Sequence, residues 1–336
     1  LHVVDLSENN LVELVRDLRS SAGYIRGDFK TFALDVGSPE FELMFRYEGP
    51  YDYVLNLSAL KHVRSERDPY SLMRMIRVNV LNTLKSIEML ERSGGRYFAV
   101  STDKATDPVN LMGATKRVME IVLSQHSESI NVSSARFANV AFSDGSLLFG
   151  FEHRLKKNQP LAIPTDIRRF FVSPEEAGQL CVVSCLIAKN KQILFPKTND
   201  LFKDVSLFEM AEKYLKFKGF KPQIFDDEFL ARNAVEECSK KRNWPCYCFA
   251  SETTGEKPFE EFYTENESVC LKSFKDIGVV DFKPDLESDD YDTFSKLYET
   301  FKEKGEWKKI DLVTLMQKFL PNFLHEEKNI YLDQKM

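Results

Sequence analysis

Residues 101–116, which read STDKATDPVNLMGATK, bring together the side chains of this chain that are best suited to acid–base chemistry. Asp103 and Lys104 are neighbours, and Lys116 follows twelve residues after Lys104. In a dry pocket a carboxylic acid can donate a proton, and a lysine crowded by positive charge can accept one. The alternative is that Asp103 and Lys104 form an ordinary surface turn. The segment is nevertheless the strongest candidate for a catalytic site.

The pattern around this segment predicts a strand at 95–102 that delivers Thr102, Asp103 and Lys104 to its carboxyl end. A helix at 111–125 would then place Met112 and Lys116 on one face. Further strands are expected at 31–36, 51–59 and 130–140, after an N-terminal strand-to-helix unit and with helical residues at 68–92. Alternating strands and helices indicate an α/β fold with a Rossmann-like, doubly wound parallel sheet. Such sheets bind ligands at the carboxyl ends of their strands.

The composition excludes several classes of protein. Acidic residues (52) outnumber basic ones (46), so the chain has no basic surplus with which to neutralise nucleic acid. The apolar content of 43% is too high for a disordered chain. The sequence contains no apolar run long enough to predict a membrane span. Six cysteines in 336 residues are too few for a disulfide scaffold and favour a cytoplasmic location. Cys246 and Cys248 lack a second ligand pair, so we predict a strand there and no metal site.

Two aspartates follow early strands and could contact a dinucleotide. Asp5 ends the first apolar run, where a carboxylate can accept hydrogen bonds from ribose hydroxyls and repels a 2′-phosphate, which favours NAD over NADP. Asp35 ends the next run and could reach the adenine. Each has a plainer alternative, because Asp5 could cap the helix that follows and Asp35 could be a solvated loop residue.

The run at 101–116 is part of a longer pattern that resembles the UDP-N-acetylglucosamine 4,6-dehydratase branch of the extended short-chain dehydrogenase/reductase superfamily. The other parts of the pattern are LNLSALKHV (55–63), RVNVLNT (77–83), RFANVAFSDGS (136–146), IRRFFVSPEEAG (167–178) and TGEKPFEEFY (254–263). The resemblance covers residues 1 to about 265. It implies an NAD-dependent enzyme of polysaccharide biosynthesis that acts on a UDP-sugar and forms homo-oligomers, either dimers or larger rings.

The resemblance also implies a division of the chain into domains. Residues 1–145 would form an NAD-binding domain, and residues 167–197 would pack back on it. Residues 146–265 would form a smaller α/β substrate domain, and residues 266–336 a helical C-terminal extension. Within this half, Ser173, Pro174 and Glu176 predict the capped start of a helix.

A 4,6-dehydratase oxidises the sugar C4 hydroxyl by hydride transfer to NAD, removes the C5 proton, expels water from C6 and returns the hydride to C6. By resemblance, Lys104 would be the base at C5 and Asp103 the acid at C6. Lys116 would hold the nicotinamide ribose, and Thr102 the C4 oxygen. Met112 stands where the superfamily usually has tyrosine, and a thioether cannot usefully accept the C4 proton. The acceptor is left open between Thr102 with Asp103 and a relay through the ribose and Lys116, and Met112 could simply fill the core.

Binding residues are carried over from the same pattern. Those expected to contact the cofactor, besides Asp5, Asp35 and Lys116, are Ser58, Ala59 and Lys61. Those expected to contact the UDP-sugar are Lys61, His62, Asn139, Arg169, Glu256 and Lys257. His62 could equally be a buried structural histidine. Asp144 stands where the family often has arginine, which removes a cation from the diphosphate contacts.

Two other functions fit the same sequence. One is a nucleotide-sugar 4-epimerase on the same scaffold, which would leave C6 intact. The other is a catalytically silent nucleotide-binding module that regulates polysaccharide assembly, and both Met112 and the scarcity of glycine favour it. Only 14 of 336 residues are glycine, and no G-x-G-x-x-G cluster is present. Because LHVVDLSENN resembles the second strand of a dinucleotide fold, we expect the first strand, its glycine loop and its helix upstream of Leu1.

Overall fold

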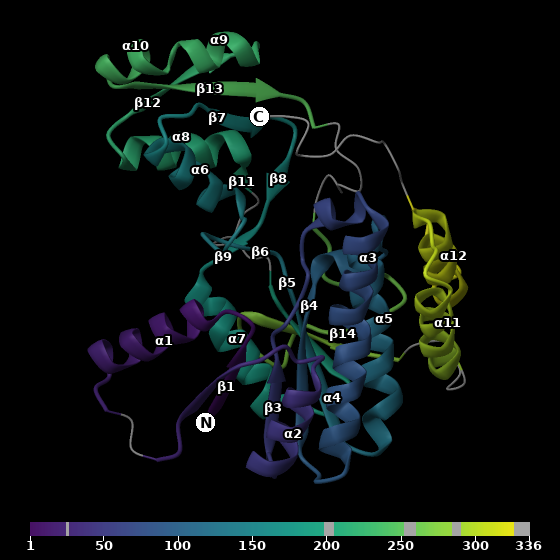
Figure 1. Ribbon diagram of the computed structural model, residues 1–336. Helices are drawn as coiled ribbons and strands as arrows, with labels where there is room; N and C mark the ends of the chain where they lie inside the picture. Colours follow the sequence, from purple (N-terminus) through teal and green to yellow (C-terminus); the bar gives the residue numbers. More distant parts are fainter. Residues whose placement is uncertain (25–26, 198–204, 252–259, 284–289, 326–336) are drawn as a thin grey trace.

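A six-stranded sheet forms the centre of the larger part of the molecule (Figure 1), a computed structural model that describes residues 1–24, 27–197, 205–251, 260–283 and 290–325. The strand order is β14 (Ser268–Cys270), β15 (Ile277–Asp281), β10 (Gln192–Pro196), β5 (Asn131–Phe137), β4 (Arg96–Thr102) and β3 (Tyr53–Asn56). Strands β3, β4, β5 and β10 run parallel, β15 pairs antiparallel with β10, and β14 pairs antiparallel with β15. The parallel strands and their helical crossovers confirm the predicted α/β class.

Helices cover both faces of this sheet. On one side lies α7 (Pro174–Ile187), which packs against β4 and β5, and on the other lie α4 (Asn82–Glu91) and α5 (Leu111–Gln125). Helix α3 (Pro69–Ile76) continues into α4 through a π-helical turn, η2 (Arg77–Leu81). The predicted start of α7 is confirmed, since the Ser173 hydroxyl accepts from the Glu176 N–H and Glu176 accepts from the Ser173 N–H.

The N-terminal strand-to-helix unit is also confirmed. Strand β1 (His2–Asp5) leads into α1 (Glu8–Ser21), which Ser7 caps, and then pairs in parallel with β2 (Lys30–Ala33). Helix α2 (Pro39–Glu48) follows and packs on α4. Within the described residues, β1 and β2 form a pair of their own beside the six-stranded sheet.

The smaller part of the molecule is a second α/β layer (Figure 1). Its parallel sheet has the order β12 (Lys221–Phe225), β13 (Asn243–Phe249) and β7 (Leu161–Pro164). Its helices are α6 (Leu147–Lys156), α8 (Leu207–Phe217), α9 (Glu228–Asn233) and α10 (Val235–Lys240). The predicted strand around Cys246 and Cys248 is confirmed as β13. Two short strand pairs lie between the parts: β6 (Asn139–Val140) with β9 (Phe171–Val172), and β8 (Arg168–Arg169) with β11 (Val205–Ser206).

The C-terminal region corrects one expectation. We predicted a helical extension from residue 266, but β14 and β15 extend the central sheet before α11 (Asp290–Lys304) and α12 (Lys309–Phe319) begin. Pairing with β10 buries Val279 and Val280, and this apolar gain outweighs the polar character of the surrounding sequence. Helix α12 packs against α3 and α5, where its side chains share one apolar cluster. Within the described ranges, no helix has the length and apolar character to cross a membrane.

Candidate active site

The carboxyl end of β4 carries the predicted acid–base pair. Thr102 caps the 3-10 turn η3 (Asp103–Ala105), and its hydroxyl donates to Asp103 Oδ1 at 2.7 Å. Lys104 Nζ lies 3.3 Å from both carboxylate oxygens of Asp103. The Asp103 side chain is only 5% exposed and that of Lys104 is 29% exposed, so a buried carboxylate pairs with a partly exposed ammonium. Such a pair can pass a proton between its members or to a ligand.

A close approach of α5 holds this turn in place. Asn110 caps α5 by accepting from the Gly113 N–H at 2.7 Å, and η3 packs on the first turn of the helix. A Cβ atom on Gly113 would lie 2.1 Å from the Lys104 carbonyl oxygen. Only glycine therefore permits this contact, which explains the glycine in the M-G-A-T-K part of the sequence.

Substituting Gly113 with alanine is expected to displace η3 and destabilise the fold by about 1–3 kcal/mol, because the clash is with backbone that cannot rotate away. Gly150→Ala in α6 is the matched control, since nothing lies within 4 Å of its added Cβ. The control is expected to be neutral or to gain about 0.5–1 kcal/mol in helix propensity. Equal urea midpoints for the two variants would contradict the close approach.

Lys116 lies one helical turn after Met112 and reaches back to the same strand. Its ammonium donates to the Val100 carbonyl at 3.0 Å and lies 3.7 Å from Met119 Sδ. Burial lowers the pKa of Lys116 to about 8, although Glu120 acts in the opposite direction. The Met112 side chain packs in the apolar cluster of α3, α5 and α12. That packing matches the alternative in which Met112 fills the core.

Glu260 is a site residue that the sequence interpretation missed. Its Oε2 accepts from the Phe170 N–H at 2.7 Å, and its Oε1 accepts from Asn139 Nδ2. Arg169 Nε lies 3.9 Å from the same carboxylate. Burial and the charge of Asp103 raise the pKa of Glu260 to about 7, while Lys104, the Phe170 hydrogen bond and Arg169 act against them. The Glu260 carboxylate thus contacts Asn139 and lies near Arg169, two of the predicted substrate-binding residues.

The signal for Glu260 was present in TGEKPFEEFY, where it follows Glu256 by four residues. The resemblance to the dehydratase family assigns Glu256, the first carboxylate of this run, as a UDP contact and assigns no role to Glu260. Glu256 and Lys257 lie outside the described residues.

Two loops that were predicted separately meet beside the site. Lys61 Nζ donates to the Ser143 hydroxyl at 3.3 Å. Gly145 has φ +71°, and a Cβ there would lie 2.5 Å from His62 Cε1. Burial lowers the pKa of Lys61 despite Asp144, and burial together with the charges of Lys61 and Arg64 lowers that of His62. His62 is therefore neutral at pH 7.

Asn79 links the Lys61 loop to α5. Its Oδ1 accepts from the Leu60 N–H at 2.9 Å, and its Nδ2 donates to the Leu60 carbonyl and the Thr115 hydroxyl at 3.0 Å each. These contacts fix the loop after β3 relative to the helix that carries Lys116.

Apart from Lys116, the predicted cofactor residues lie at the end of β1 or in the segments that follow β2 and β3. Asp5 Oδ1 accepts from the Ser7 N–H at 2.6 Å, and Asp35 Oδ1 accepts from the Gly37 N–H at 2.8 Å. The Ser58 hydroxyl donates to Asn56 Oδ1 at 2.6 Å, and Ala59 follows in the same loop. The second oxygen of Asp5 could accept from a ligand, whereas that of Asp35 already lies 3.9 Å from Arg77 Nη2.

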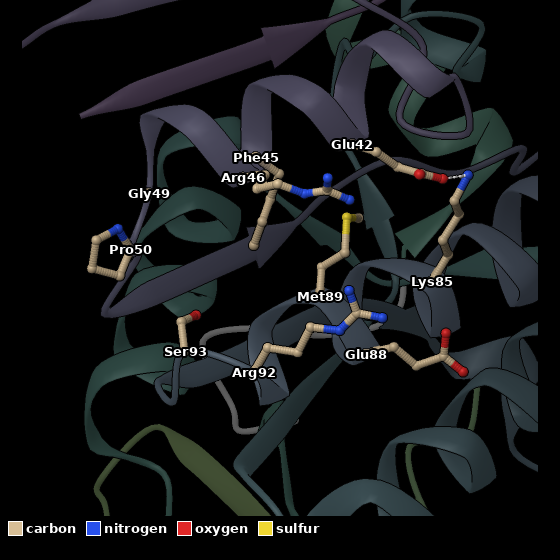
Figure 2. A pocket seen from close by; sticks show the side chains of 10 residues that line it. All are labelled: Glu42, Phe45, Arg46, Gly49, Pro50, Lys85, Glu88, Met89, Arg92 and Ser93. Carbon is tan, nitrogen blue, oxygen red and sulfur yellow. Dashed lines mark ion pairs between the residues drawn. The ribbon is translucent and has the colours of Figure 1, made fainter.

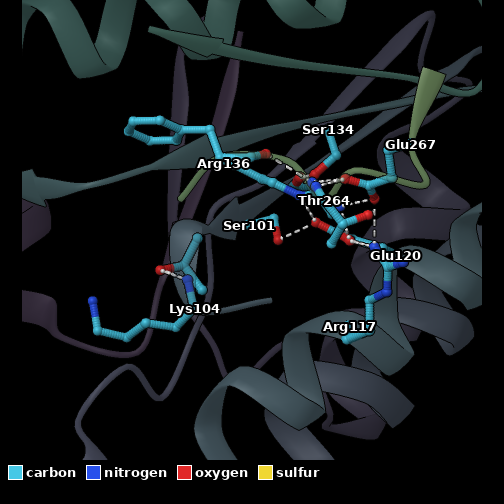
Figure 3. A network of polar contacts seen from close by, with 11 residues as sticks. Ser101, Lys104, Arg117, Glu120, Ser134, Arg136, Thr264 and Glu267 are labelled. Carbon is cyan, nitrogen blue, oxygen red and sulfur yellow. Dashed lines mark hydrogen bonds and ion pairs between the residues drawn. The ribbon is translucent and has the colours of Figure 1, made fainter. Parts of the chain in front are cut away.

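Behind the acid–base pair lies a buried ion-pair network (Figure 3). Arg136 on β5 donates to both oxygens of Glu120 at 2.9 Å and to both oxygens of Glu267 at 2.7 Å. Arg117 bridges the two carboxylates, and the Ser101 hydroxyl donates to Glu120 at 2.7 Å. The Lys104 side chain points away from this network. The network therefore anchors the end of β4 through Ser101 and, among the described residues, makes no hydrogen bond to the side chains of Asp103 or Lys104.

A surface pocket of about 470 Å³ lies elsewhere (Figure 2). Its lining comes from α2, α4 and the residues after them, namely Glu42, Phe45, Arg46, Gly49, Pro50, Lys85, Glu88, Met89, Arg92 and Ser93. These segments precede β3 and β4, so the pocket lies at the amino ends of the strands, away from every predicted site residue. Among the described residues, no group of three or more His, Cys, Asp or Glu side chains is arranged to hold a metal ion.

The sequence of this chain matches one known protein family and several individual proteins. The family described as polysaccharide biosynthesis protein matches residues 1–281. An uncharacterized membrane protein of Methanocaldococcus jannaschii, MJ1061, is 30% identical over 83% of this chain and 77% of its own length. The capsular polysaccharide biosynthesis protein CapD of Staphylococcus aureus is 29% identical over 66% of this chain, which spans only 37% of CapD. The UDP-N-acetylglucosamine 4,6-dehydratase (inverting) of Campylobacter jejuni is 29% identical over 44% of this chain and 46% of the enzyme.

Solved structures share the fold. Pen from Bacillus thuringiensis superposes with a TM-score of 0.64, at 23% identity over 83% of this chain and 80% of Pen. A double mutant of DesIV, a dTDP-glucose 4,6-dehydratase from Streptomyces venezuelae with NAD bound, superposes with a TM-score of 0.57 at 14% identity, over 78% of each chain. At these identities the likeness concerns the fold alone.

Proposed function

This chain belongs to the polysaccharide biosynthesis protein family, and from that premise we propose that it is an NAD-dependent 4,6-dehydratase of a UDP-sugar. The substrate would be UDP-N-acetylglucosamine or a close relative, and the product a 4-keto-6-deoxy sugar for surface polysaccharide. The observation that carries the proposal is the pairing of Lys104 with the buried Asp103 carboxylate at the carboxyl end of β4. An epimerase that only transfers a hydride needs no such pair, whereas elimination of water needs both an acid and a base.

The residues around the pair suit a nicotinamide dinucleotide, which supplies a reversible hydride acceptor when bound. Asp5 would accept from the adenosine ribose and, through its charge, disfavour a 2′-phosphate. The Lys116 ammonium has three N–H donors, of which one is directed to the Val100 carbonyl and one to the Met119 sulfur. Within the described part of the chain, the third N–H has no partner. That donor is suited to a ribose hydroxyl. Asp35, Ser58, Ala59 and Lys61 would line the remainder of the cofactor.

The acid and the base have complementary tasks. Lys104 would take the C5 proton, and Asp103 would protonate the C6 hydroxyl as it leaves, so that the pair ends with the same number of protons. The Thr102 hydroxyl, which donates to Asp103, would also contact the C4 oxygen. The C4 proton acceptor stays open between Thr102 with Asp103 and a relay through Lys116.

The UDP-sugar would lie between the two parts of the molecule. Lys61 and His62 come from the loop after β3, and Asn139 and Arg169 come from the short strands between the parts. Cations and amide donors are suited to a diphosphate and a sugar. Glu256 and Lys257 stay predictions as further UDP contacts, as do a cytoplasmic location and a homo-oligomer.

Incubation with NAD and UDP-N-acetylglucosamine in D₂O tests the proposal. Dehydration is expected to give a product that has lost one water and gained deuterium at C5, because the C5 proton exchanges with solvent. An unchanged mass with inverted C4 would indicate the 4-epimerase, and retention of NAD without turnover of any UDP-hexose would indicate the silent nucleotide-binding module.

A further inference from the structure

Glu66, in the 3-10 turn η1 (Val63–Glu66), is a fully buried carboxylate at the start of α5. Its Oε1 accepts from the Met112 N–H at 2.7 Å. Met112 lies in the first turn of α5, where N–H groups have no acceptor within the helix, and Asn110 accepts from the next of these, on Gly113. A carboxylate is also favoured there by the helix dipole. Glu66 thus caps α5 from a position 46 residues away in the chain.

The second oxygen of Glu66 faces the C-terminal segment of the described chain. His325 Nε2 lies 3.5 Å from Glu66 Oε2, and the His325 side chain is only 7% exposed. Neither atom has a hydrogen-bond partner among the described residues. Burial of a carboxylate oxygen costs free energy unless a donor or a positive charge faces it. Within the described residues, His325 is the one basic side chain at ion-pair distance from Glu66.

Packing of the C-terminal helices brings His325 to this position (Figure 1). Helix α12 packs against α3 and α5, and Phe323, which follows it, is buried in their apolar cluster. The rings of Phe323 and His325 lie 6.0 Å apart. Trp307 Nε1, just before α12, donates to the carbonyl of Pro69, the first residue of α3, at 3.1 Å. His325 is therefore held against Glu66 by a segment that is itself anchored on α3 and α5.

The start of α5 determines where the acid–base turn η3 lies. Met112 is followed by Gly113, which approaches the Lys104 carbonyl so closely that an added Cβ would lie 2.1 Å from its oxygen. A shift of the first turn of α5 therefore moves the backbone of Lys104. Because η1 follows the loop after β3, the hydrogen bond from Met112 to Glu66 also fixes that loop relative to η3.

We propose that Glu66 is a positioning residue for the acid–base turn and that His325 keeps Glu66 in place, so that the C-terminal segment supports the active site. Glu66 acts through the Met112 backbone and α5, since its two oxygens face Met112 and His325. The effect on catalysis rests on the proposed dehydratase function, whereas the effect on the start of α5 does not.

Amide hydrogen exchange, resolved by residue in the full chain, tests the positioning without turnover. We expect His325→Ala to speed exchange of the Met112 N–H by about tenfold or more, because Glu66 loses the group that faces its second oxygen. The amide of Phe98, within the core strand β4, reports global opening and is expected to change much less. His153→Ala, at an exposed histidine of α6, is the control and is expected to change neither. An unchanged Met112 amide, or equal acceleration at Phe98, would overturn the proposal.

Kinetics test the consequence for the reaction. Glu66→Ala removes the acceptor for the Met112 N–H, whereas Glu66→Gln keeps an acceptor and removes the charge. We expect Glu66→Ala to lower kcat by about tenfold or more with a smaller change in KM, and Glu66→Gln to recover part of that loss. Adding His325→Ala to Glu66→Ala is expected to cost nothing more, because His325 acts through Glu66. Additive losses would exclude that route. If Glu66→Ala does not fold, His325→Ala and Glu66→Gln give the same comparison.

The two measurements separate this proposal from the proposed function. If the protein dehydrates no UDP-sugar but His325→Ala speeds exchange at Met112, the positioning holds and the dehydratase function fails. If the protein dehydrates its substrate and the Met112 amide does not respond to His325→Ala, the function holds and the positioning by His325 and Glu66 is refuted.

Discussion

Replacing Lys104 with alanine is expected to lower kcat for water elimination by about 10²–10⁴-fold, the usual contribution of a positioned acid–base group. Lys104 Nζ is the basic group that lies against Asp103 at the end of β4, at 3.3 Å from both carboxylate oxygens. Without it, no amine in this pair can take the C5 proton. The measurement is the rate of product formation together with deuterium uptake at C5 in D₂O, and both are expected to fall in parallel.

One further variant distinguishes a role of Lys104 as a base from a role of its positive charge, and a second variant serves as the control. Lys104→Arg keeps a cation beside Asp103 but cannot release its proton at neutral pH, so it is expected to be as inactive as Lys104→Ala. Lys156→Ala, at an exposed lysine that pairs with Glu152 on α6, serves as the control and is expected to retain full activity. Full turnover by Lys104→Ala would exclude Lys104 as the base, and substantial activity in Lys104→Arg would assign it an electrostatic role instead.

The second large effect concerns stability. Arg136→Ala is expected to lower the free energy of unfolding by about 3–5 kcal/mol, because it leaves Glu120 and Glu267 as buried charges without their main partner. Arg232→Ala removes an exposed ion pair with Glu228 on α9 and is expected to cost about 1 kcal/mol or less. Urea unfolding at pH 7 measures both. Equal losses in the two variants would show that the Arg136 network contributes no more than a surface pair.

The same network predicts how stability depends on pH. Burial alone would raise the pKa of Glu267, but the hydrogen bonds and charges of Arg136 and Arg117 outweigh it and hold the pKa at about 2, below the ordinary 4.5. A depressed carboxyl pKa stabilises the fold above the unfolded value, and this contribution is lost as the pH falls from about 4.5 towards 2. The stability difference between the unmodified protein and Arg136→Ala is therefore expected to shrink below pH 4.5.

Local patterns in the sequence determined much of the fold. The strands that end at Asp5, Thr102 and Phe137 and the helix that begins after Ser173 follow from apolar periodicity and capping, which depend on neighbouring residues only. The turn that carries Asp103 and Lys104 was located for the same reason, since polar residues directly after a buried strand lie at its carboxyl end.

Contacts between distant segments could not be predicted in this way. Strand β15 forms because it pairs with β10, and β14 forms because it pairs with β15. The local sequence of these two strands does not identify β10 as the neighbour. Glu260 joins the site through Asn139 and Phe170, which lie 121 and 90 residues away in the chain. Likewise, Arg136 connects α5 to Glu267 over 131 residues.

The sequence by itself determined which residues are candidates for acid–base chemistry and at which end of the sheet they lie, because both follow from side-chain type and local order. Only the tertiary structure decided the surroundings of those residues: the burial of Asp103, the contact of Glu260 with Asn139, and the Met112 side chain within the core. The physical reason is that desolvation and charge coupling depend on three-dimensional proximity, which one-dimensional spacing does not encode.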